Sequence, residues 1–177
     1  WVQLNRTLRA RKFFFESLHS FVRGCIEMGI PIRGGIALGN CICNKGENVY
    51  LGQAIIDAYR VEQSIDFVGA AFHQSVKTID LSRFPDEIVD YPVERFRKRR
   101  GAKLLPPADF LSKVIYWNSW RAQSTLRADV ARLKRLRSRS PKRDWPKYTN
   151  TIRYLMKVPP RDPEILRLLE NAREQLG

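Results

Sequence analysis

The residue types best suited to hold a phosphorylated ligand gather between residues 31 and 64. Two adjacent glycines, Gly34 and Gly35, lie inside an apolar stretch that we expect to be a strand. Glycine removes the side chain where a ligand or a second backbone approaches a strand closely. Gly52 stands at the start of a helical pattern, where a backbone amide can face a phosphate. A bulge or a crowded contact between helix and sheet is the alternative explanation for the twin glycines.

Residues that could ligate a metal are sparse. Cys41 and Cys43 alternate with Ile42 and so share one face of a strand, either as a metal or redox pair or as two small apolar residues. His19 and His73 lie far apart in sequence, so we expect no structural zinc site. The three cysteines show no disulfide framework, which favours a reducing compartment, and we expect a cytoplasmic protein.

Positive charge is concentrated in two segments. The formal net charge is +14, and residues 121–147 carry ten Lys and Arg against two Asp, a net of +8. The segment Arg95–Arg100 adds five more positive charges. Such charge favours nucleic acid, a membrane surface or nucleotide phosphates, without choosing among them. No apolar run reaches the roughly 20 residues of a membrane helix, so we expect no membrane-spanning segment.

Hydrophobic periodicity predicts the elements that position these residues. We expect helices over residues 11–29, 52–65, 123–137 and 148–157, and another beginning at Asp162. In the first of these helices, the apolar residues that keep helical spacing are Phe14, Leu18, Phe21, Cys25 and Met28. Strands are expected over residues 30–38, 67–72, 89–96 and 114–120, and a hairpin that turns at residues 44–48 and returns through Tyr50 and Leu51.

This order of elements predicts an α+β fold, with helices over an antiparallel sheet in an α/β sandwich. An additional strand before Arg11 would complete a ferredoxin-like unit. We expect residues 1–120 to form the main domain and residues 121–177 to form a basic helical extension packed on it.

Three segments resemble a known family. In YLGQAIIDAYRVEQS, the residues Gly52, Ala58, Arg60 and Glu62 are in register with the motif of class III nucleotidyl cyclases. Two further segments resemble the divergent bacterial branch that includes the Pycsar pyrimidine cyclases of anti-phage defence. They are IRGGIALGN, which precedes this motif, and KYTNTIRYL at residues 147–155. The resemblance covers residues 20–75 firmly and residues 110–157 loosely.

The resemblance implies a ferredoxin-like sandwich of class III cyclase type. It also implies an enzyme that converts CTP or UTP to a 3′,5′-cyclic monophosphate second messenger and pyrophosphate in anti-phage defence. The family acts as a homodimer in which both subunits contribute to each site.

The resemblance also assigns candidate site residues. Arg60 matches the arginine that meets the transferring phosphate, where a guanidinium can bind developing charge. Val49 matches the base-reading position and has no donor or acceptor, which favours either a different base or a rearranged pocket. The remaining candidates for nucleotide contact are Arg33, Gly34, Gly35, Tyr50, Gly52 and Lys98. Ile56 replaces the asparagine of the family motif.

The family holds two divalent cations, Mg²⁺ or Mn²⁺, with a pair of aspartates that precede the first long helix. Neither aspartate motif is present in this chain, and Asp57, Asp66 and Asp80 lie at other positions. We expect the first strands and the metal ligands to lie upstream of Trp1. The alternatives are a catalytically inactive regulatory domain, or a nucleic-acid-binding module that uses the basic residues 121–147 with Trp117, Trp120 and Trp145.

Overall fold

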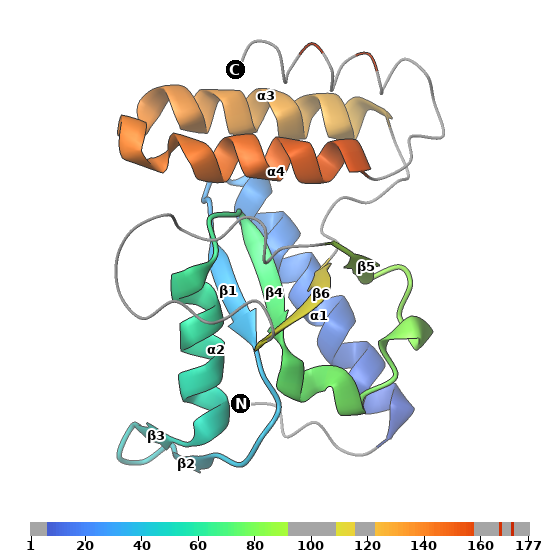
Figure 1. Ribbon diagram of the computed structural model, residues 1–177, viewed down its shortest axis with the longest axis vertical. Coiled ribbons are helices and arrows are strands. Elements are labelled where there is room, and N and C mark those ends of the chain that lie inside the picture. Colours follow the sequence, from blue (N-terminus) through green and yellow to red (C-terminus); the bar gives the residue numbers. More distant parts are fainter. Residues whose placement is uncertain (1–6, 92–108, 116–122, 158–166, 168–170, 172–177) are drawn as a thin grey trace.

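The computed structural model describes residues 7–91, 109–115 and 123–157, together with residues 167 and 171. Within these ranges, three short 3-10 helices also occur, at Gln74–Thr78 (η1), Leu81–Arg83 (η2) and Lys142–Asp144 (η5). The principal elements in chain order are α1 (Leu8–Glu27), β1 (Arg33–Ile36), β2 (Ile42–Asn44), β3 (Val49–Leu51), α2 (Gln53–Ser64), β4 (Gly69–His73), β5 (Ile88–Asp90), β6 (Phe110–Ile115), α3 (Gln123–Arg139) and α4 (Trp145–Lys157). The chain is therefore α+β (Figure 1). Residue 162, where a further helix was expected to begin, lies outside the described residues.

The main sheet has the strand order β1-β4-β6-β5 and is mixed. The β4–β6 and β5–β6 pairs are antiparallel, but β1 and β4 are parallel, with Gly35 opposite Ala71. The expectation of an antiparallel sheet was therefore wrong at this pair. The reason is that α2 crosses over between β1 and β4 and returns the chain in its original direction.

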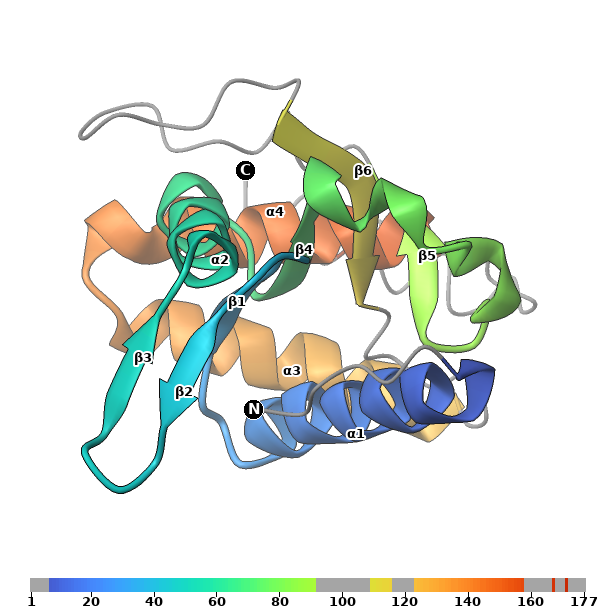
Figure 2. The same cartoon turned by 90° about the horizontal axis from the view of Figure 1, so that it is seen from below.

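The predicted hairpin forms, but it lies outside the main sheet. Strands β2 and β3 pair antiparallel with each other, and Ile42 faces Leu51 across the pair. The turn between them contains Asn48, whose φ is positive, at 53°. The hairpin projects from the body of the molecule next to the beginning of α2 (Figure 2).

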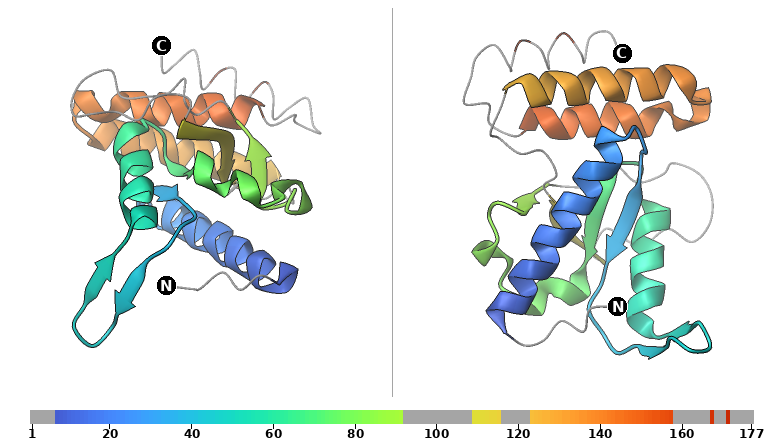
Figure 3. Two further views of the ribbon diagram at one scale, coloured as in Figure 1. Left: turned by 60° about the horizontal axis from the view of Figure 1, so that its bottom comes forward. Right: turned by 180° about the vertical axis from the view of Figure 1, so that it is seen from behind.

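Helices α1 and α2 cover opposite faces of the sheet (Figure 3). On the α1 face, the ring of Phe15 lies 6.1 Å from that of Phe72 on β4. Two of the apolar residues that keep helical spacing, Phe21 and Met28, are 61% and 69% exposed. The buried residues of α1 are Phe15, Val22, Cys25 and Ile26. The helix is apolar on more than one side, so helical spacing alone does not identify its buried residues.

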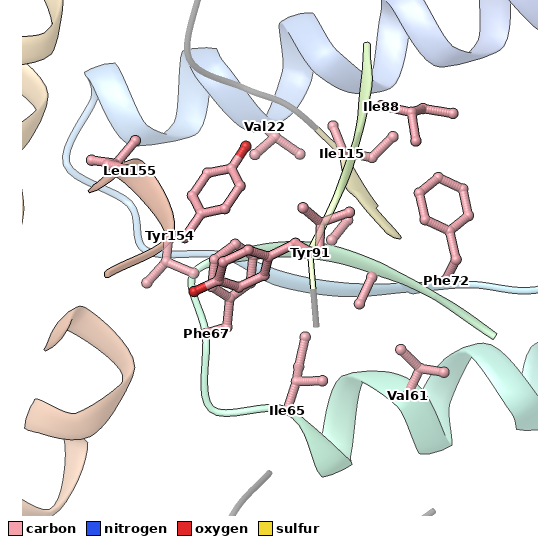
Figure 4. Close-up of a cluster of buried hydrophobic side chains, with 14 of the residues drawn as sticks. Val22, Val61, Ile65, Phe67, Phe72, Ile88, Tyr91, Ile115, Tyr154 and Leu155 are labelled. Atoms are coloured by element: carbon pink, nitrogen blue, oxygen red, sulfur yellow. The ribbon is translucent and has the colours of Figure 1, made fainter. Parts of the chain in front are cut away.

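One continuous hydrophobic core joins the sheet to the helices on both faces and to α3 and α4. At its centre, the rings of Phe67, Tyr91 and Tyr154 lie 4.9–5.8 Å apart (Figure 4). From α3, Val130 and Leu133 enter the same cluster. Helices α3 and α4 therefore contribute to the same core as the sheet.

Helix α4 is anchored to the loop that leads into β4. The side chain of Asn150 donates to the carbonyl of Asp66 at 2.7 Å, and the Val68 amide donates to the hydroxyl of Thr151 at 2.9 Å. The Tyr91 hydroxyl donates to the carbonyl of Asn150. Burial raises the pKa of this tyrosine, which keeps it neutral. The KYTNT segment therefore has a structural role, because it positions the strand at the centre of the sheet.

Candidate functional site

The two adjacent glycines of β1 have different surroundings. A Cβ atom on Gly35 would lie 1.9 Å from the carbonyl oxygen of Ala58 and 2.9 Å from the Cβ of Val61. Gly35 is thus required by the close approach of α2 to the sheet, as the alternative explanation held. A Cβ atom on Gly34 would meet only the Cβ of Ala70, at an ordinary 3.5 Å. Gly34 is the glycine whose presence helix packing does not explain.

Arg33 stabilises the carboxyl end of α2. Its guanidinium donates to the carbonyl of Ile65 at 3.2 Å and pairs with Glu62 at 3.0 Å. A cation at the carboxyl end of a helix also interacts favourably with the helix dipole. Gly52 begins the opposite end of α2. The structure therefore does not bring Arg33 together with the candidates at the hairpin, and it uses the motif residue Glu62 as an ion-pair partner.

Gly52 allows the chain to cross itself at the base of the hairpin. Its φ is 151°, and a Cβ atom there would lie 2.4 Å from the carbonyl oxygen of Asn40 and 2.7 Å from the Cα of Cys41. It is the N-cap of α2, and no side chain caps the helix at this position. The beginning of α2 is thus fixed next to the hairpin, with its positive dipole end uncovered by a capping side chain.

Arg60 lies on the exposed side of α2. Within the part of the chain that the structure describes, its side chain forms no ion pair. It is two helical turns from Gly52, about 12 Å along the axis. Next to it, Ile56 and Tyr59 are 47% and 63% exposed. An unpaired arginine on a partly apolar surface is available to bind an anion.

The hairpin presents further apolar side chains to solvent. Ile42, Tyr50 and Leu51 are 69%, 41% and 61% exposed, while Val49 is half-buried. The sulfur atoms of Cys41 and Cys43 are 3.8 Å apart and both residues are exposed, so they lie on one side as expected. The structure therefore brings together Val49, Tyr50 and Gly52, whereas Lys98 lies outside the described residues.

A buried polar network, which sequence reasoning missed, lies beneath the first half of α2. Asp57 accepts a hydrogen bond from Gln53 at 2.7 Å, and its other oxygen is 3.9 Å from Nδ1 of His73. The same Nδ1 atom is 3.0 Å from the Ser75 hydroxyl, which accepts from the Leu38 amide. These groups meet at the carboxyl ends of the parallel strands β1 and β4. Only the parallel pairing of β1 and β4 brings them together, and no sequence spacing signals it.

The described residues do not fit a two-metal centre. No group of three or more His, Cys, Asp or Glu side chains among residues 7–91, 109–115 and 123–157 is arranged to hold a metal ion. Asp57 is engaged by Gln53 beneath α2, and Asp80 is bonded by Ser82 and Arg83 on a distant loop. The two cations that the family resemblance implies would need ligands from outside these residues.

A pocket of about 240 Å³ lies elsewhere, between the beginning of α1 and the 3-10 helices η1 and η2. None of the predicted site residues lines it. Its lining consists of Leu8, Arg11, Thr78, Asp80, Arg83 and Phe84. At α2 and the hairpin, Ile42, Leu51 and Tyr59 are 69%, 61% and 63% exposed, so a nucleotide bound there would need a second wall to enclose it.

No protein-family model, curated protein sequence or solved structure matches this chain. Among the described residues, no helix is both long and apolar enough to cross a membrane.

Proposed function

We propose that this chain belongs to a nucleotidyl cyclase that converts CTP or UTP to a 3′,5′-cyclic monophosphate and pyrophosphate. A class III cyclase fold and a role in anti-phage defence belong to the same proposal. It rests on the motif resemblance of residues 31–64 and 147–155. The observation that carries it is the exposed, unpaired Arg60 on a helix that begins, without a side-chain cap, directly after a hairpin.

The arrangement gives each residue a role in the proposed reaction. The 3′-hydroxyl loses its proton to water, its oxygen attacks the α-phosphorus, and the bond from this phosphorus to the α,β-bridging oxygen breaks, so that pyrophosphate leaves. Negative charge builds on the non-bridging oxygens during this step. The Arg60 guanidinium binds these oxygens through charge-assisted hydrogen bonds. The amide end of α2 at Gly52 faces the phosphates, as helix N-termini do with anions. Tyr50, 41% exposed, offers a ring on which the base stacks, and Val49 limits hydrogen bonding to a purine edge.

A second copy of the chain would supply the missing wall of the site. The exposed apolar side chains on the hairpin and on α2 support a homodimer, because such residues are commonly covered in an interface. They are Ile42, Tyr50, Leu51, Ile56 and Tyr59. The proposed dimer places Arg60 next to the partner subunit rather than in open solvent.

Divalent cations would support in-line phosphoryl chemistry when bound. Because the described residues do not fit such a centre, the roles proposed here concern binding of the phosphates and the base only.

The experiment is a product screen with the full-length protein. The protein is incubated with Mn²⁺ and each of the four ribonucleoside triphosphates in turn, and the products are separated by chromatography and identified by mass. We expect a cyclic monophosphate from CTP or UTP and none from ATP or GTP. A product from a purine nucleotide alone would contradict the pyrimidine assignment, and no product from any of the four would contradict the enzyme.

A further inference from the structure

The α3–α4 turn carries positive charge that the described part of the protein does not compensate. Residues 131–143 contain seven Lys and Arg and no Asp or Glu. The acidic residues that flank this segment in sequence are already engaged, since Asp129 pairs with Arg132 at 3.0 Å and Asp144 lies 3.9 Å from Lys147. Four basic side chains at the turn are exposed and form no ion pair with a described residue; they are Arg135, Arg139, Lys142 and Arg143. We call these four residues the basic turn.

The backbone that carries the basic turn is held in one shape. The Ser140 hydroxyl donates to the carbonyl of Leu136 at 2.7 Å and lies 2.8 Å from the Tyr148 hydroxyl. The indole nitrogen of Trp145 donates to the carbonyl of Ser140 at 3.1 Å. The guanidinium of Arg137 stacks over the Trp145 ring at 4.3 Å. A cationic surface that is ordered before binding loses less conformational entropy when it meets a polyanion.

The apolar side of these helices is not available to a membrane. Val130 and Leu133 of α3 are buried in the core, as are Tyr148 and Ile152 of α4. Among the described residues, the exposed large apolar side chains lie on α1, α2 and the hairpin and in the loop before β1, not on α3 or α4. A surface-bound membrane helix needs an exposed apolar face beside its basic residues. The basic turn can therefore attract a partner only through its positive charge.

We propose that the basic turn binds the phosphate backbone of nucleic acid. It lies at one end of the α3–α4 pair, away from the hairpin and the beginning of α2 (Figure 1). The site is therefore separate from the proposed nucleotide site and does not depend on it. Trp145 does not serve as a stacking platform for bases, because Arg137 covers one face of its ring and Ser140 holds its nitrogen. Binding is consequently independent of base sequence.

The test is fluorescence anisotropy with a duplex DNA of about 20 base pairs and a single-stranded RNA of similar length, over a range of salt concentrations. The turn variant carries Arg135→Gln, Arg139→Gln, Lys142→Gln and Arg143→Gln. The matched control removes the same charge from other exposed positions through Arg9→Gln, Lys12→Gln, Lys45→Gln and Lys77→Gln. Circular dichroism verifies that both variants fold.

Neutralising four phosphate contacts should make the slope of log affinity against log salt for the duplex shallower by about 3 to 4. We expect this change, with an affinity loss of about 10²-fold at low salt, in the turn variant and not in the control. Equal losses in both variants would show that only net charge matters and would overturn the proposal. It would equally be overturned if phosphatidylserine vesicles bound the protein while neither nucleic acid did.

Discussion

Gly34 and Gly35 are neighbours in β1, and a side chain added to each would project to opposite faces of the sheet. Only Gly35 is enclosed by α2, through the carbonyl of Ala58. Gly52 is required for a similar reason, because the backbone at Asn40 passes too close to it to leave room for a side chain. A glycine in a ligand-binding motif can therefore be required by packing alone. Substitution by alanine distinguishes a packing role from a ligand-binding role.

Gly35→Ala should destabilise the protein by about 2 kcal/mol or more, because the new methyl group must push α2 away from β1. Gly34→Ala should change the free energy of unfolding by less than about 1 kcal/mol, since its Cβ makes an ordinary contact. Urea unfolding measures both. Equal losses for the two variants would contradict the assignment of the packing role to Gly35.

Asp129 should make stability depend on pH. Its side chain is buried, and this burial raises the pKa of its carboxyl, which Arg23 and Arg132 only partly offset. The folded state therefore holds the proton more tightly than the unfolded state does. The resulting stabilisation is fully present below the unfolded pKa of about 3.9 and is lost as pH rises through the raised folded value.

We expect Asp129→Asn to flatten this decline in the free energy of unfolding between about pH 4 and neutral pH. The control is Asp144→Asn, at a half-exposed residue of the α3–α4 turn. This variant should keep the wild-type dependence of the free energy of unfolding on pH. An unchanged profile in Asp129→Asn would show that another group causes the dependence.

At the scale of elements, the sequence predicted what local pattern encodes. The helices around residues 8–27, 53–64, 123–139 and 145–157 were found close to their expected bounds. The Asn44–Asn48 turn was also correct. The parallel pairing of β1 with β4 was not predicted, because strand direction depends on how α2 packs. For the same reason the network of Asp57, His73 and Ser75 could not be foreseen from spacing.

The role of the KYTNT segment is an element-scale prediction. Thr151→Val keeps the shape of the side chain but leaves the buried Val68 amide without its acceptor. We expect a loss of about 1–3 kcal/mol in the free energy of unfolding. Thr149→Val is the matched control, because the hydroxyl of Thr149 donates within its own helix, to the carbonyl of Trp145, and to no other described residue. The control should change stability by less than about 0.5 kcal/mol.

At the scale of the whole molecule, the proposed activity depends on the exposed surface formed by α2 and the hairpin. The described chain presents an arginine, a helix N-terminus and a hairpin on an open surface, and a second copy would enclose a nucleotide between them. The resemblance supplied the residues of this surface. The sequence alone did not show that Arg33 is engaged at the other end of α2, because that contact joins residues 33, 62 and 65 only after folding.

The proposed homodimer can be tested with two apolar residues of equal exposure. Leu51 on the hairpin and Phe21 on α1 are both 61% exposed. Leu51→Lys should convert the dimer to a monomer in sedimentation experiments, whereas Phe21→Lys should leave it intact. A wild-type monomer, or a dimer that only the Phe21 variant disrupts, would contradict an interface at the hairpin.

The most direct test of the central claim is the initial rate of cyclic nucleotide formation in Arg60→Ala. The control is Arg9→Ala, which removes another exposed helical arginine, on α1. Because a single donor to a developing oxyanion contributes about 10²–10³ in rate, Arg60→Ala should lower turnover by that factor while Arg9→Ala keeps the wild-type rate. Wild-type turnover in a folded Arg60→Ala protein would contradict the claim that α2 presents this arginine to the reacting phosphate.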